Sequence, residues 1–344
     1  MKIITQVLPA DRPENIRLAA DILRRGGLVA FPTETVYGLG ADGLQAAAVR
    51  NIFLAKGRPQ DNPLILHVAS ADWLPRFCSP VPETALQLAQ RYWPGPLTMI
   101  LPRLPLVPDA VTAGLDTVGV RCPAHPAARA LIAAADVPVA APSANTSGRP
   151  SPTTAAHVLE DLNGKVELIL DGGPCSVGVE STIVDLTVQP PRLLRPGGIT
   201  LEQLQAVLGE VAVDAAVTRR MGAGEQPRAP GMKYRHYAPR APVAVIPGAP
   251  AASAAWILAH AQPGDGVICF DEYSAQFSAL TVRTLGPAAD AAAHAQRVFD
   301  ALRAFDDTAV PRIWAQCPDP AGLDLAVVNR LQKAAGFHII NING

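Results

Sequence analysis

The sequence predicts an α/β protein of two domains, a larger one with a mixed sheet and a smaller one with a parallel sheet. At 344 residues the chain is too long for one small domain and fits about two of roughly 100–200 residues each. Hydrophobic residues make up 49% of the chain and charged residues 17%, so it can bury a substantial core. Helical and extended patterns alternate along the chain, and this alternation is interrupted only at residues 211–240.

The first 210 residues read as helices alternating with short buried strands. Asp11 is expected to cap the first helix, with Glu14 three residues later and Pro13 in the first turn, and Gly26 and Gly27 end that helix. Further helices are expected at 43–55, 83–92 and 125–135. Strands are expected at 28–31, 64–68, 97–101, 118–121, 137–141, 168–171 and 182–186.

Residues 211–240 form the predicted linker, because this stretch is only weakly periodic and then crowded with Pro, Gly, Arg and Tyr. A second alternation begins at residue 243. Strands are expected at 243–246, 266–270 and 312–315, and helices at 251–260, 288–305 and from 322 onward. The predicted division is therefore 1–210, 211–240 and 241–344, with a small parallel sheet in the last part.

Charge and cysteine content exclude several classes of protein. The 29 basic and 30 acidic residues give a formal charge of −1, which excludes a strongly basic nucleic-acid coat or a polybasic membrane binder. The five cysteines are scattered and contain no CxxC pair, so neither a disulfide framework nor a structural zinc site is indicated. The first residues do not resemble a signal peptide and no run is apolar enough to span a membrane, so we expect a cytoplasmic protein.

The string from Gly38 to Gly43 matches the G-x-G-x-x-G pattern of dinucleotide-binding loops, and it follows a predicted strand. In a dinucleotide site the strand runs directly into the first glycine, whereas here residues 32–37 intervene. The acidic residue at the appropriate distance is Asp61, which lies in a Pro-rich loop. We therefore do not interpret the string as a nicotinamide or flavin site, and no P-loop motif is present.

Polar and cationic side chains recur at the ends of predicted elements. Taken singly, each has an ordinary alternative: Lys56 and Arg58 could lie on a solvated loop, and His67 could be a satisfied core histidine. Taken together, they predict a positively charged crevice at the strand ends, suited to a triphosphate or a carboxylate. The residues concerned are Thr35, Lys56, Arg58, His67, Arg121, Ser143, Asn145, Ser181 and Arg195. No nucleophile–base arrangement or metal-ligand cluster stands out, so positioning and charge would carry the chemistry.

With these residues assembled, the chain resembles the two-domain form of the threonylcarbamoyl-AMP synthase family. Residues 1 to about 205 are similar to the YrdC-like domain. The matching strings are FPTETVYGLG at 31–40, KGR at 56–58, NPL at 62–64, WPGPLT at 93–98, VGVR at 118–121, PSAN at 142–145 and EST at 180–182. The string PGMKYRHYAP at 230–239 is specific to the two-domain form. The chain departs from the pattern at Ala229, where serine is common, and this puts no catalytic residue in doubt.

This resemblance implies a fold, a reaction and partners. The fold would be a YrdC-like twisted mixed sheet around a cationic cavity, plus a small Rossmann-like parallel α/β domain. L-threonine, bicarbonate and ATP would give threonylcarbamoyl-AMP and pyrophosphate, with Mg²⁺ entering together with ATP. A downstream transferase would then use the product to modify tRNA adenosine next to the anticodon. The linker would act as a lid over the active site.

The resemblance also implies roles for individual residues. The phosphate-binding tetrad would be Lys56, Arg58, Ser143 and Asn145. Contacts to ATP would come from Arg58, Asn62, Thr117, Ser143, Ser151, Arg195 and Tyr234. Contacts to threonine would come from Thr35, His67, Arg121, Ser181 and the backbone of Ala141. We expect no protein-bound metal, no membrane attachment and no strong direct binding of nucleic acid.

Two alternatives remain open from the sequence. The first is an RNA-binding or ribosome-associated module, because YrdC-like domains have a basic concave face; the net charge and the lack of interleaved aromatic and basic residues argue against it. The second is carbamoyl transfer from carbamoyl phosphate, as in hydrogenase-maturation proteins that contain this domain. The zinc-finger and acylphosphatase-like segments of those proteins are missing here.

Overall fold

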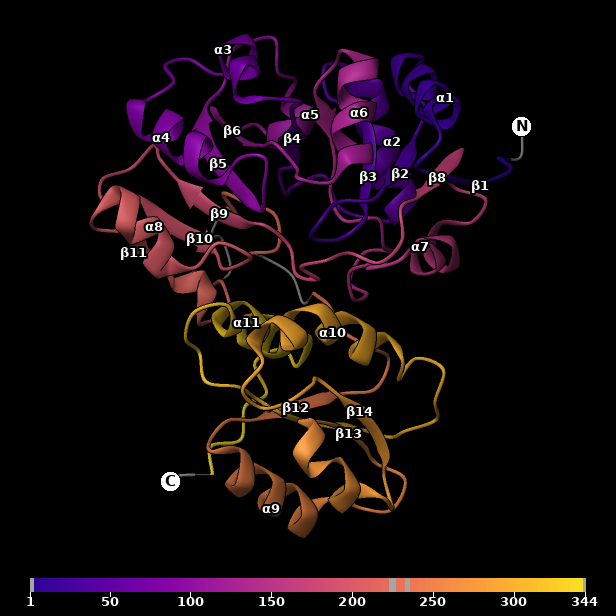
Figure 1. Cartoon of the computed structure of the whole chain (residues 1–344), viewed down its shortest axis with the longest axis vertical. Coiled ribbons are helices and arrows are strands. Elements are labelled where there is room, and N and C mark those ends of the chain that lie inside the picture. The colour runs from indigo at the N-terminus through magenta and orange to yellow at the C-terminus, as the bar shows by residue number, and fades with distance from the viewer. Residues whose placement is uncertain (1–2, 223–226, 233–235, 343–344) are drawn as a thin grey trace.

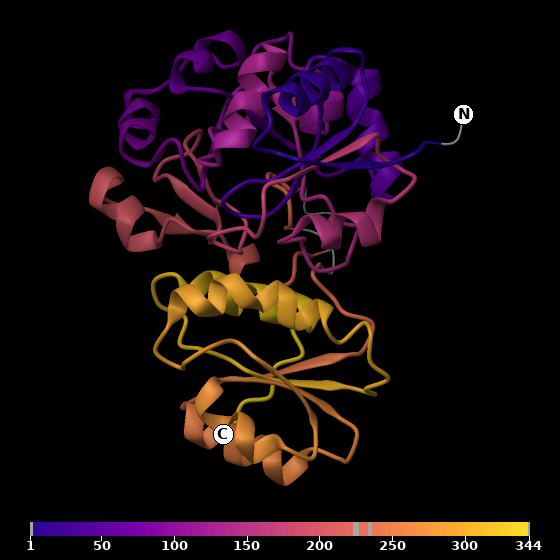
Figure 2. The same cartoon turned by 45° about the vertical axis from the view of Figure 1, so that its right-hand side comes forward.

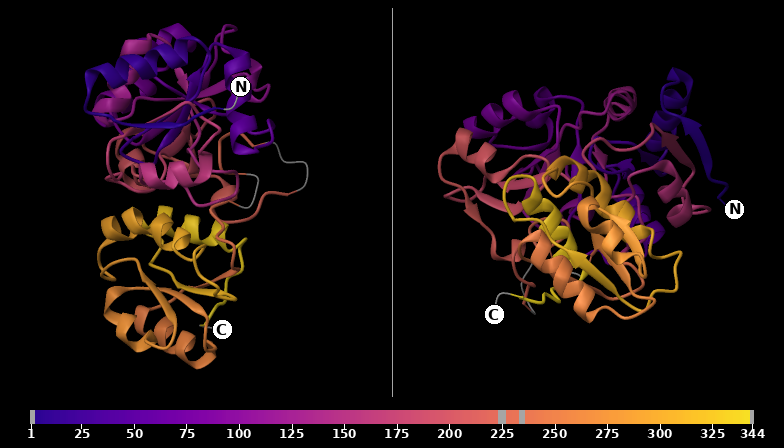
Figure 3. Two further views of the ribbon diagram at one scale, coloured as in Figure 1. Left: turned by 90° about the vertical axis from the view of Figure 1, so that its right-hand side faces the viewer. Right: turned by 60° about the horizontal axis from the view of Figure 1, so that its bottom comes forward.

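The computed structural model describes residues 3–222, 227–232 and 236–342. Figure 1 shows two domains stacked end to end, with the N-terminus on one and the C-terminus on the other. Figure 3 shows the same stacking from the side. Both domains contain helices packed on a sheet, so the predicted α/β class is confirmed.

The N-terminal domain carries the longer series of elements. Its strands are β1 (Gln6–Pro9), β2 (Val29–Phe31), β3 (Gly38–Asp42), β4 (Ile65–His67), β5 (Leu97–Pro102), β6 (Thr117–Arg121), β7 (Val139–Ala140), β8 (Leu168–Asp171), β9 (Thr182–Asp185), β10 (Arg192–Arg195) and β11 (Ala212–Val213). Its helices are α1 (Pro13–Arg24), α2 (Ala46–Lys56), α3 (Leu74–Phe77), α4 (Glu83–Tyr92), α5 (Asp109–Thr112), α6 (Pro126–Ala135), α7 (Ala155–Leu162) and α8 (Leu201–Leu208).

These strands form one mixed sheet in the order β1-β8-β2-β3-β7-β4-β6-β5-β9-β10-β11. Strands β4 and β6 run parallel, and their register places His67 opposite Arg121. Strand β5 is antiparallel to β6, and its Thr98 also lies opposite Arg121. One row across the middle of the sheet therefore carries three polar side chains, while Leu66, Met99 and Val120 on the same strands are buried in the core.

The C-terminal domain is built on a second, wholly parallel sheet. Its strands are β12 (Val243–Ile246), β13 (Gly266–Cys269), β14 (Thr281–Thr284) and β15 (Ile313–Gln316), in the order β12-β15-β13-β14. Its helices are α9 (Pro250–His260), α10 (Ala291–Arg303) and α11 (Asp324–Ala334). Helix α9 covers one face of the sheet, and α10 and α11 cover the other, between the sheet and the N-terminal domain (Figure 2).

Helices α10 and α11 also form the contact between the domains. Arg303 of α10 donates hydrogen bonds to Asp161 Oδ2 at 2.8 Å and to the carbonyl of Pro150 at 2.7 Å. A Cβ atom on Gly178 would lie 2.4 Å from the Cα of Gln296, and Gly178 has φ +83°. A glycine is therefore required where the N-terminal domain meets α10.

Most predicted elements agree with the structure to within a few residues, but one prediction was wrong. Asp11 does not cap α1: the N-cap is Arg12, without a side-chain hydrogen bond, because Pro13 already occupies the first helical position and needs no N–H partner. Residues Gly38 to Asp42 of the glycine string form β3, a strand that the sequence did not predict. A Cβ on Gly40 would lie 2.7 Å from Val139, so this glycine serves close packing of the sheet.

Among the residues that the structure describes, no helix is long and apolar enough to cross a membrane.

Candidate functional site

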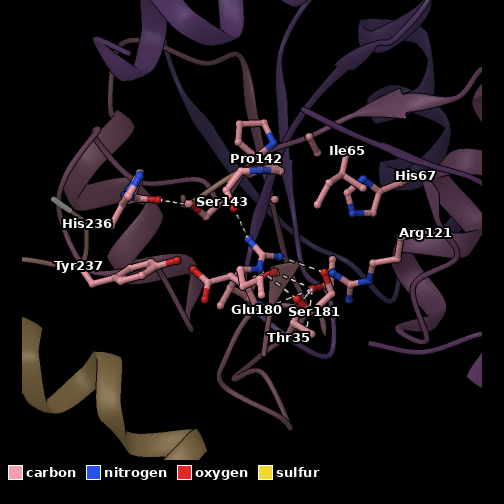
Figure 4. A pocket seen from close by; sticks show the side chains of 18 of the residues that line it. Thr35, Ile65, His67, Arg121, Pro142, Ser143, Glu180, Ser181, His236 and Tyr237 are labelled. Atoms are coloured by element: carbon pink, nitrogen blue, oxygen red, sulfur yellow. Dashed lines mark hydrogen bonds between the residues drawn. The ribbon is translucent and has the colours of Figure 1, made fainter. Parts of the chain in front are cut away.

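A cavity of about 70 Å³ lies between the large sheet and the linker. Strands β3, β4, β6 and β10 line it, together with the loops next to β2, β7 and β9. His67 and Arg121 lie on one side of this cavity, and His236 and Tyr237 lie on the opposite side (Figure 4). Its lining residues are Thr33, Thr35, Val36, Gly38, Arg58, Ile65, His67, Arg121, Ala141, Pro142, Ser143, Asn145, Arg149, Glu180, Ser181, Arg195, Pro230, Gly231, His236 and Tyr237.

Arg121 is fixed at the end of β6 by a buried ion pair. Its Nη2 donates to Glu34 Oε1 at 2.7 Å, and the other carboxylate oxygen of Glu34 accepts from the backbone N–H of Ala124 at 3.0 Å. The Nε of Arg121 also donates to the carbonyl of Gly95 at 3.3 Å. These contacts hold the guanidinium in one orientation at the cavity wall, where it can meet a carboxylate.

His67 is buried beside Arg121 and faces the same cavity. Its Nδ1 lies 3.3 Å from the carbonyl of Val139, a contact that places the ring proton on Nδ1. Burial and then the charge of Arg121 lower the pKa of His67 to about 3. The imidazole is therefore neutral at physiological pH, and its other ring nitrogen can accept a hydrogen bond.

Three hydroxyl groups and one arginine form the floor of the cavity between these two residues and the linker. The Oγ1 atoms of Thr33 and Thr35 are 2.8 Å apart, and Ser181 Oγ lies 2.8 Å from Thr98 Oγ1. Arg195 donates to Ser181 Oγ at 3.1 Å and to the Ser181 carbonyl at 3.0 Å. Burial, opposed by the charge of Glu180, lowers the pKa of Arg195 to about 10, so it remains a cation.

Arg58 lines the cavity from the loop that follows α2. Gly57 ends that helix with φ +62°, and the turn directs Arg58 back toward the sheet. Its Nη2 donates to the carbonyls of Asn62 at 3.0 Å and Pro63 at 3.2 Å. The side-chain amide of Asn62 is buried and has no hydrogen-bond partner among the described residues, which leaves it available to a ligand.

Lys56 differs from the sequence prediction. It was expected on an exposed loop, but it is the last residue of α2, is 3% exposed and is absent from the cavity lining. Its Nζ donates to the carbonyls of Ser143 and Asn145, both at 2.5 Å, and to Asn145 Oδ1 at 3.3 Å. Burial and then the charge of Arg58 lower the pKa of Lys56 well below its usual value. Through these hydrogen bonds Lys56 holds the loop that carries Ser143 and Asn145 in place.

Glu180 is a carboxylate in the wall of this otherwise cationic cavity. Its Oε1 accepts from Ser151 Oγ at 2.5 Å, and its Oε2 accepts from Arg330 Nε at 2.8 Å. Burial would raise the pKa of Glu180, but the charges of Arg330 and Arg195 outweigh burial and lower that pKa to about 2. Arg330 belongs to α11, so the C-terminal domain contributes to this wall.

The described part of the linker closes the remaining side. Tyr237 has φ +64°, and its ring packs against Phe299 of α10 with the centroids 5.1 Å apart. Lys333 of α11 donates to the carbonyl of Gly231, another lining residue. Ala229 is fully buried in an apolar cluster with Met232, which accounts for the alanine at this position. Tyr234, predicted to contact ATP, lies outside the described residues.

The structure brings most, but not all, of the predicted site residues together. Those that line the cavity are Thr35, Arg58, His67, Arg121, Ala141, Ser143, Asn145, Ser181 and Arg195. Lys56, Asn62 and Ser151 lie just behind the wall, in contact with lining residues. Thr117 is at the opposite end of β6 from Arg121, about 13 Å away along the strand, and does not line the cavity. The N–H of Ala141 donates to Ile65, so the expected backbone contact would use the Ala141 carbonyl.

The sequence reasoning did not assign roles to Glu34, Arg149, Glu180, His236 and Tyr237. Glu34 and Glu180 stand inside the quoted strings FPTETVYGLG and EST, so a signal for them was present. His236 and Tyr237 stand in the same string as Tyr234, PGMKYRHYAP at 230–239, but the resemblance implied a substrate contact only for Tyr234. Nothing around Arg149 distinguishes it in the sequence from an exposed loop cation.

The charged groups do not fit a resident Mg²⁺ ion. Mg²⁺ prefers oxygen ligands, usually one or two carboxylates together with phosphates and water. Both carboxylates at the cavity, Glu34 and Glu180, are already held by arginines. Across residues 3–222, 227–232 and 236–342 no group of three or more His, Cys, Asp or Glu side chains could hold a metal ion.

The arrangement can bind two different anions at once. On one side Arg121, His67 and the hydroxyls of Thr35 and Ser181 fit a small polar molecule with a carboxylate. On the other side Arg58, Arg195 and Ser143 present donors suited to phosphate groups. Both sets of donors are largely buried, and burial strengthens such electrostatic contacts.

Comparisons with known proteins identify relatives that extend over the whole chain. A family model described as telomere recombination matches residues 21–197, and a model described as the C-terminal domain of threonylcarbamoyl-AMP synthase matches residues 199–336. The threonylcarbamoyl-AMP synthase of Pyrococcus abyssi is 49% identical, covering 99% of this chain and 100% of the relative. The Bacillus subtilis enzyme of the same name is 47% identical, covering 98% and 97%. The crystal structure of Pyrococcus abyssi Sua5 complexed with L-threonine has a TM-score of 0.91 at 47% identity, covering 100% of both chains.

Proposed function

The chain belongs to the threonylcarbamoyl-AMP synthase family, and we propose that its cavity joins L-threonine, bicarbonate and ATP into threonylcarbamoyl-AMP with release of pyrophosphate. The enzyme is an ATP-using nucleotidyltransferase whose substrates include L-threonine. The observation that carries the proposal is that one cavity has Arg121 and His67 on one side, suited to a carboxylate, and Arg58 and Arg195 on the other, suited to phosphates. A reaction between an amino-acid derivative and a nucleotide needs both sides within one enclosure.

The side with Arg121 and His67 is the proposed threonine site. The guanidinium of Arg121, oriented by Glu34, would bind the threonine carboxylate. The neutral His67 and the hydroxyls of Thr35 and Ser181 would contact the amine and the side-chain hydroxyl. The amine must be unprotonated to react with bicarbonate, and a neutral imidazole does not add a second positive charge beside it.

The side with Arg58 and Arg195 is the proposed triphosphate site. The carbamate, formed from threonine and bicarbonate with loss of one water, is a weak nucleophile, so catalysis depends on holding it in line with the α-phosphate. Arg58 and Arg195 would stabilise the charge that develops on the leaving pyrophosphate. Ser143 and Asn145 would add donors from a loop that Lys56 holds in place.

We also propose that the linker opens and closes this cavity. The free volume of about 70 Å³ is less than half of the roughly 150 Å³ cavity that holds one benzene molecule, so it is too small for ATP together with threonine. The wall opposite the sheet is made by Pro230, Gly231, His236 and Tyr237 of the linker. Displacing this wall admits the substrates, and closing it protects the mixed anhydride product from hydrolysis.

Limited proteolysis of the full chain tests the lid. We expect cleavage within residues 211–240 to slow when ATP and threonine are both present, and cleavage elsewhere to be unchanged. A linker that is cut at the same rate with and without the substrates would contradict the lid.

The proposal includes three further properties. Mg²⁺ arrives as the ATP complex, since the described carboxylates of the cavity are already paired. A separate transferase takes the product and modifies tRNA adenosine. The protein acts in the cytoplasm, because all five cysteines are free thiols buried in the fold, as is usual in a reducing compartment.

Pyrophosphate release by the purified protein tests the main proposal. We expect release to require threonine and bicarbonate together, with threonylcarbamoyl-AMP identified by mass spectrometry as the product. Release that is independent of threonine would contradict the proposal. If carbamoyl phosphate replaced bicarbonate, the protein would instead be a carbamoyltransferase, and an RNA-binding module would release no pyrophosphate at all.

A further inference from the structure

We propose that Arg330, on α11 of the C-terminal domain, is a positioning residue of the active site. It neutralises Glu180 and holds it in the cavity wall, so that the cavity keeps the positive field which its two anionic substrates need. The proposal rests on the proposed function, because it concerns the binding of threonine and ATP. It gives the C-terminal domain a direct electrostatic role in a site that otherwise belongs to the N-terminal domain and the linker.

The contact between Arg330 and Glu180 is fully enclosed. Arg330 has no exposed surface, and its Nε donates to Glu180 Oε2 at 2.8 Å. Its Nη1 donates to the side chain of Asn329 at 2.9 Å, and its Nη2 has no hydrogen-bond partner among the described residues. Within the part of the chain that the structure describes, Arg330 forms its ion pair with Glu180. A buried charge is stable only when it is paired, so each of these two groups depends on the other.

Glu180 transmits this contact to residues predicted to bind the substrates. Its second oxygen accepts from Ser151 Oγ at 2.5 Å, and Ser181 follows it directly in the chain. A Cβ atom on Gly197 would lie 2.3 Å from the carbonyl of Glu180, so the turn after β10 packs tightly on the same segment. Gly197 therefore restricts the backbone next to Ser181, and Arg330 and Ser151 together fix the side chain of Glu180.

The sign of the charge makes the pairing functionally important. Glu180 lines the cavity, and both proposed substrates are anions. The pKa of Glu180 is about 2, since the charges of Arg330 and Arg195 outweigh its burial, so the group stays ionised. Without Arg330 this carboxylate would repel the substrates and would compete with them for Arg195.

Helix α11 is hydrogen-bonded to the N-terminal domain and the linker on both sides of Arg330, and these bonds hold Arg330 beside Glu180. On one side of Arg330, Asn329 Nδ2 donates to the carbonyl of Val217 at 2.7 Å. One turn along the helix, Lys333 donates to the carbonyl of Gly231 in the cavity wall. Figures 1 and 2 show α11 lying directly beneath the N-terminal domain.

The test compares three variants of the full chain. Arg330→Met removes the charge and keeps much of the side-chain volume, and Glu180→Gln/Arg330→Met removes both charges. Gln296→Ala is the matched control: Gln296 of α10 also bonds across the domain contact, to the Ser176 carbonyl at 2.7 Å, but does not touch the cavity wall. Pyrophosphate release gives KM and kcat at several pH values, and calorimetry measures the binding of threonine alone.

For Arg330→Met we expect KM for threonine and for ATP to rise on the order of tenfold or more, since each tenfold corresponds to about 1.4 kcal/mol of lost attraction. The pKa of Glu180 should rise, because its burial is then opposed by Arg195 and Lys333 without Arg330, while Tyr237, which also faces Glu180, stays neutral. The defect should therefore shrink as the pH falls and Glu180 becomes protonated. The double variant should recover most of the affinity and lose this pH dependence, while Gln296→Ala should resemble the wild type.

Several outcomes would overturn the inference. Wild-type KM values in a folded Arg330→Met protein would do so, and so would a double variant no better than the single one, because a merely structural Arg330 predicts that the second substitution adds damage. If Arg330→Met does not fold by circular dichroism, Arg330→Lys, which keeps the charge, is compared with Arg330→Gln, which does not; Arg330→Lys should bind threonine more tightly, and equal binding by the two would contradict the proposal. A wild-type protein that releases no pyrophosphate would instead refute the proposed function.

Discussion

Replacement of Lys56 separates two roles that a cation at this position could have. The sequence places it on a loop as a phosphate ligand, whereas the structure buries it beneath the loop of Ser143 and Asn145. Lys56→Met keeps the length of the side chain and removes its three donated hydrogen bonds. We therefore expect a loss of stability together with a loss of activity.

The size of the stability loss follows from the contacts. The buried carbonyls of Ser143 and Asn145 would each lose a charged donor, and an unsatisfied buried polar group costs about 1–3 kcal/mol, so the two cost about 2–6 kcal/mol. Methionine also removes the penalty of burying an ammonium group, which the lowered pKa of Lys56 reflects. We expect a net loss of about 2–4 kcal/mol, which lowers Tm by roughly 4–16 °C for a domain of this size.

Thermal unfolding of Lys56→Met beside Lys165→Met measures this loss. Lys165 is exposed and donates a single bond, to the Asp161 carbonyl at 3.1 Å, so its replacement should change Tm by about 1–2 °C at most. Activity of Lys56→Met should fall as well, because the supported loop carries two lining residues. A Lys56→Met protein with wild-type Tm and strongly reduced turnover would refute the reasoning and favour a direct phosphate contact.

Three other predictions concern the cavity itself. Arg58→Ala should lower kcat for pyrophosphate release on the order of 10²-fold with Tm nearly unchanged, because Arg58 is only half-buried; near-normal turnover would contradict its role at the phosphates. Serine should be used as an alternative substrate, with a kcat/KM about 10–200-fold below that of threonine. Valine should be rejected more strongly because it lacks the hydroxyl, and equal turnover of valine and threonine would rule out the proposed pocket. His67 has a folded pKa of about 3, below its ordinary 6.5, so the unfolded chain binds the proton first and stability is lost as the pH falls from 6.5 toward 3. In urea unfolding, His67→Gln should lose less stability than the wild type between pH 7 and 5, by about 1.4 kcal/mol per unit of pH below 6.5; parallel losses would contradict the neutral, buried His67.

The fold was predictable where buried strands and amphipathic helices are long enough to show a period. Helix α4 and strands β8 and β12 were predicted with the bounds that the structure has. Strand β1 has an irregular exposure pattern at the edge of the sheet, so no alternation marks it in the sequence. Helix α8 was also missed, although Thr200 and Gln203 form a capping box that could have identified it.

The site was predictable where a polar residue ends a buried strand. His67 and Arg121 stand out in this way, and the register of β4 and β6 brings them side by side. The burial of Lys56 was not predicted, because the motif shows which residues adjoin it in sequence and not which residues pack on it. Whether a cation at the end of a helix reaches solvent or a backbone carbonyl depends on the loop packed above it, here residues about 90 positions away.

The contribution of the C-terminal domain could not be read from the sequence, since α11 gives no motif. Its buried face carries Asn329, Arg330 and Lys333, and in the sequence these read as the polar face of an ordinary amphipathic helix. Only the tertiary contact shows that they point toward Glu180 and the linker instead of solvent. Loss of the C-terminal domain would remove Arg330 from Glu180 and leave Arg195 as a cationic neighbour of this buried carboxylate. The proposed site therefore draws on both domains, and separating them should impair substrate binding even where the N-terminal domain remains folded.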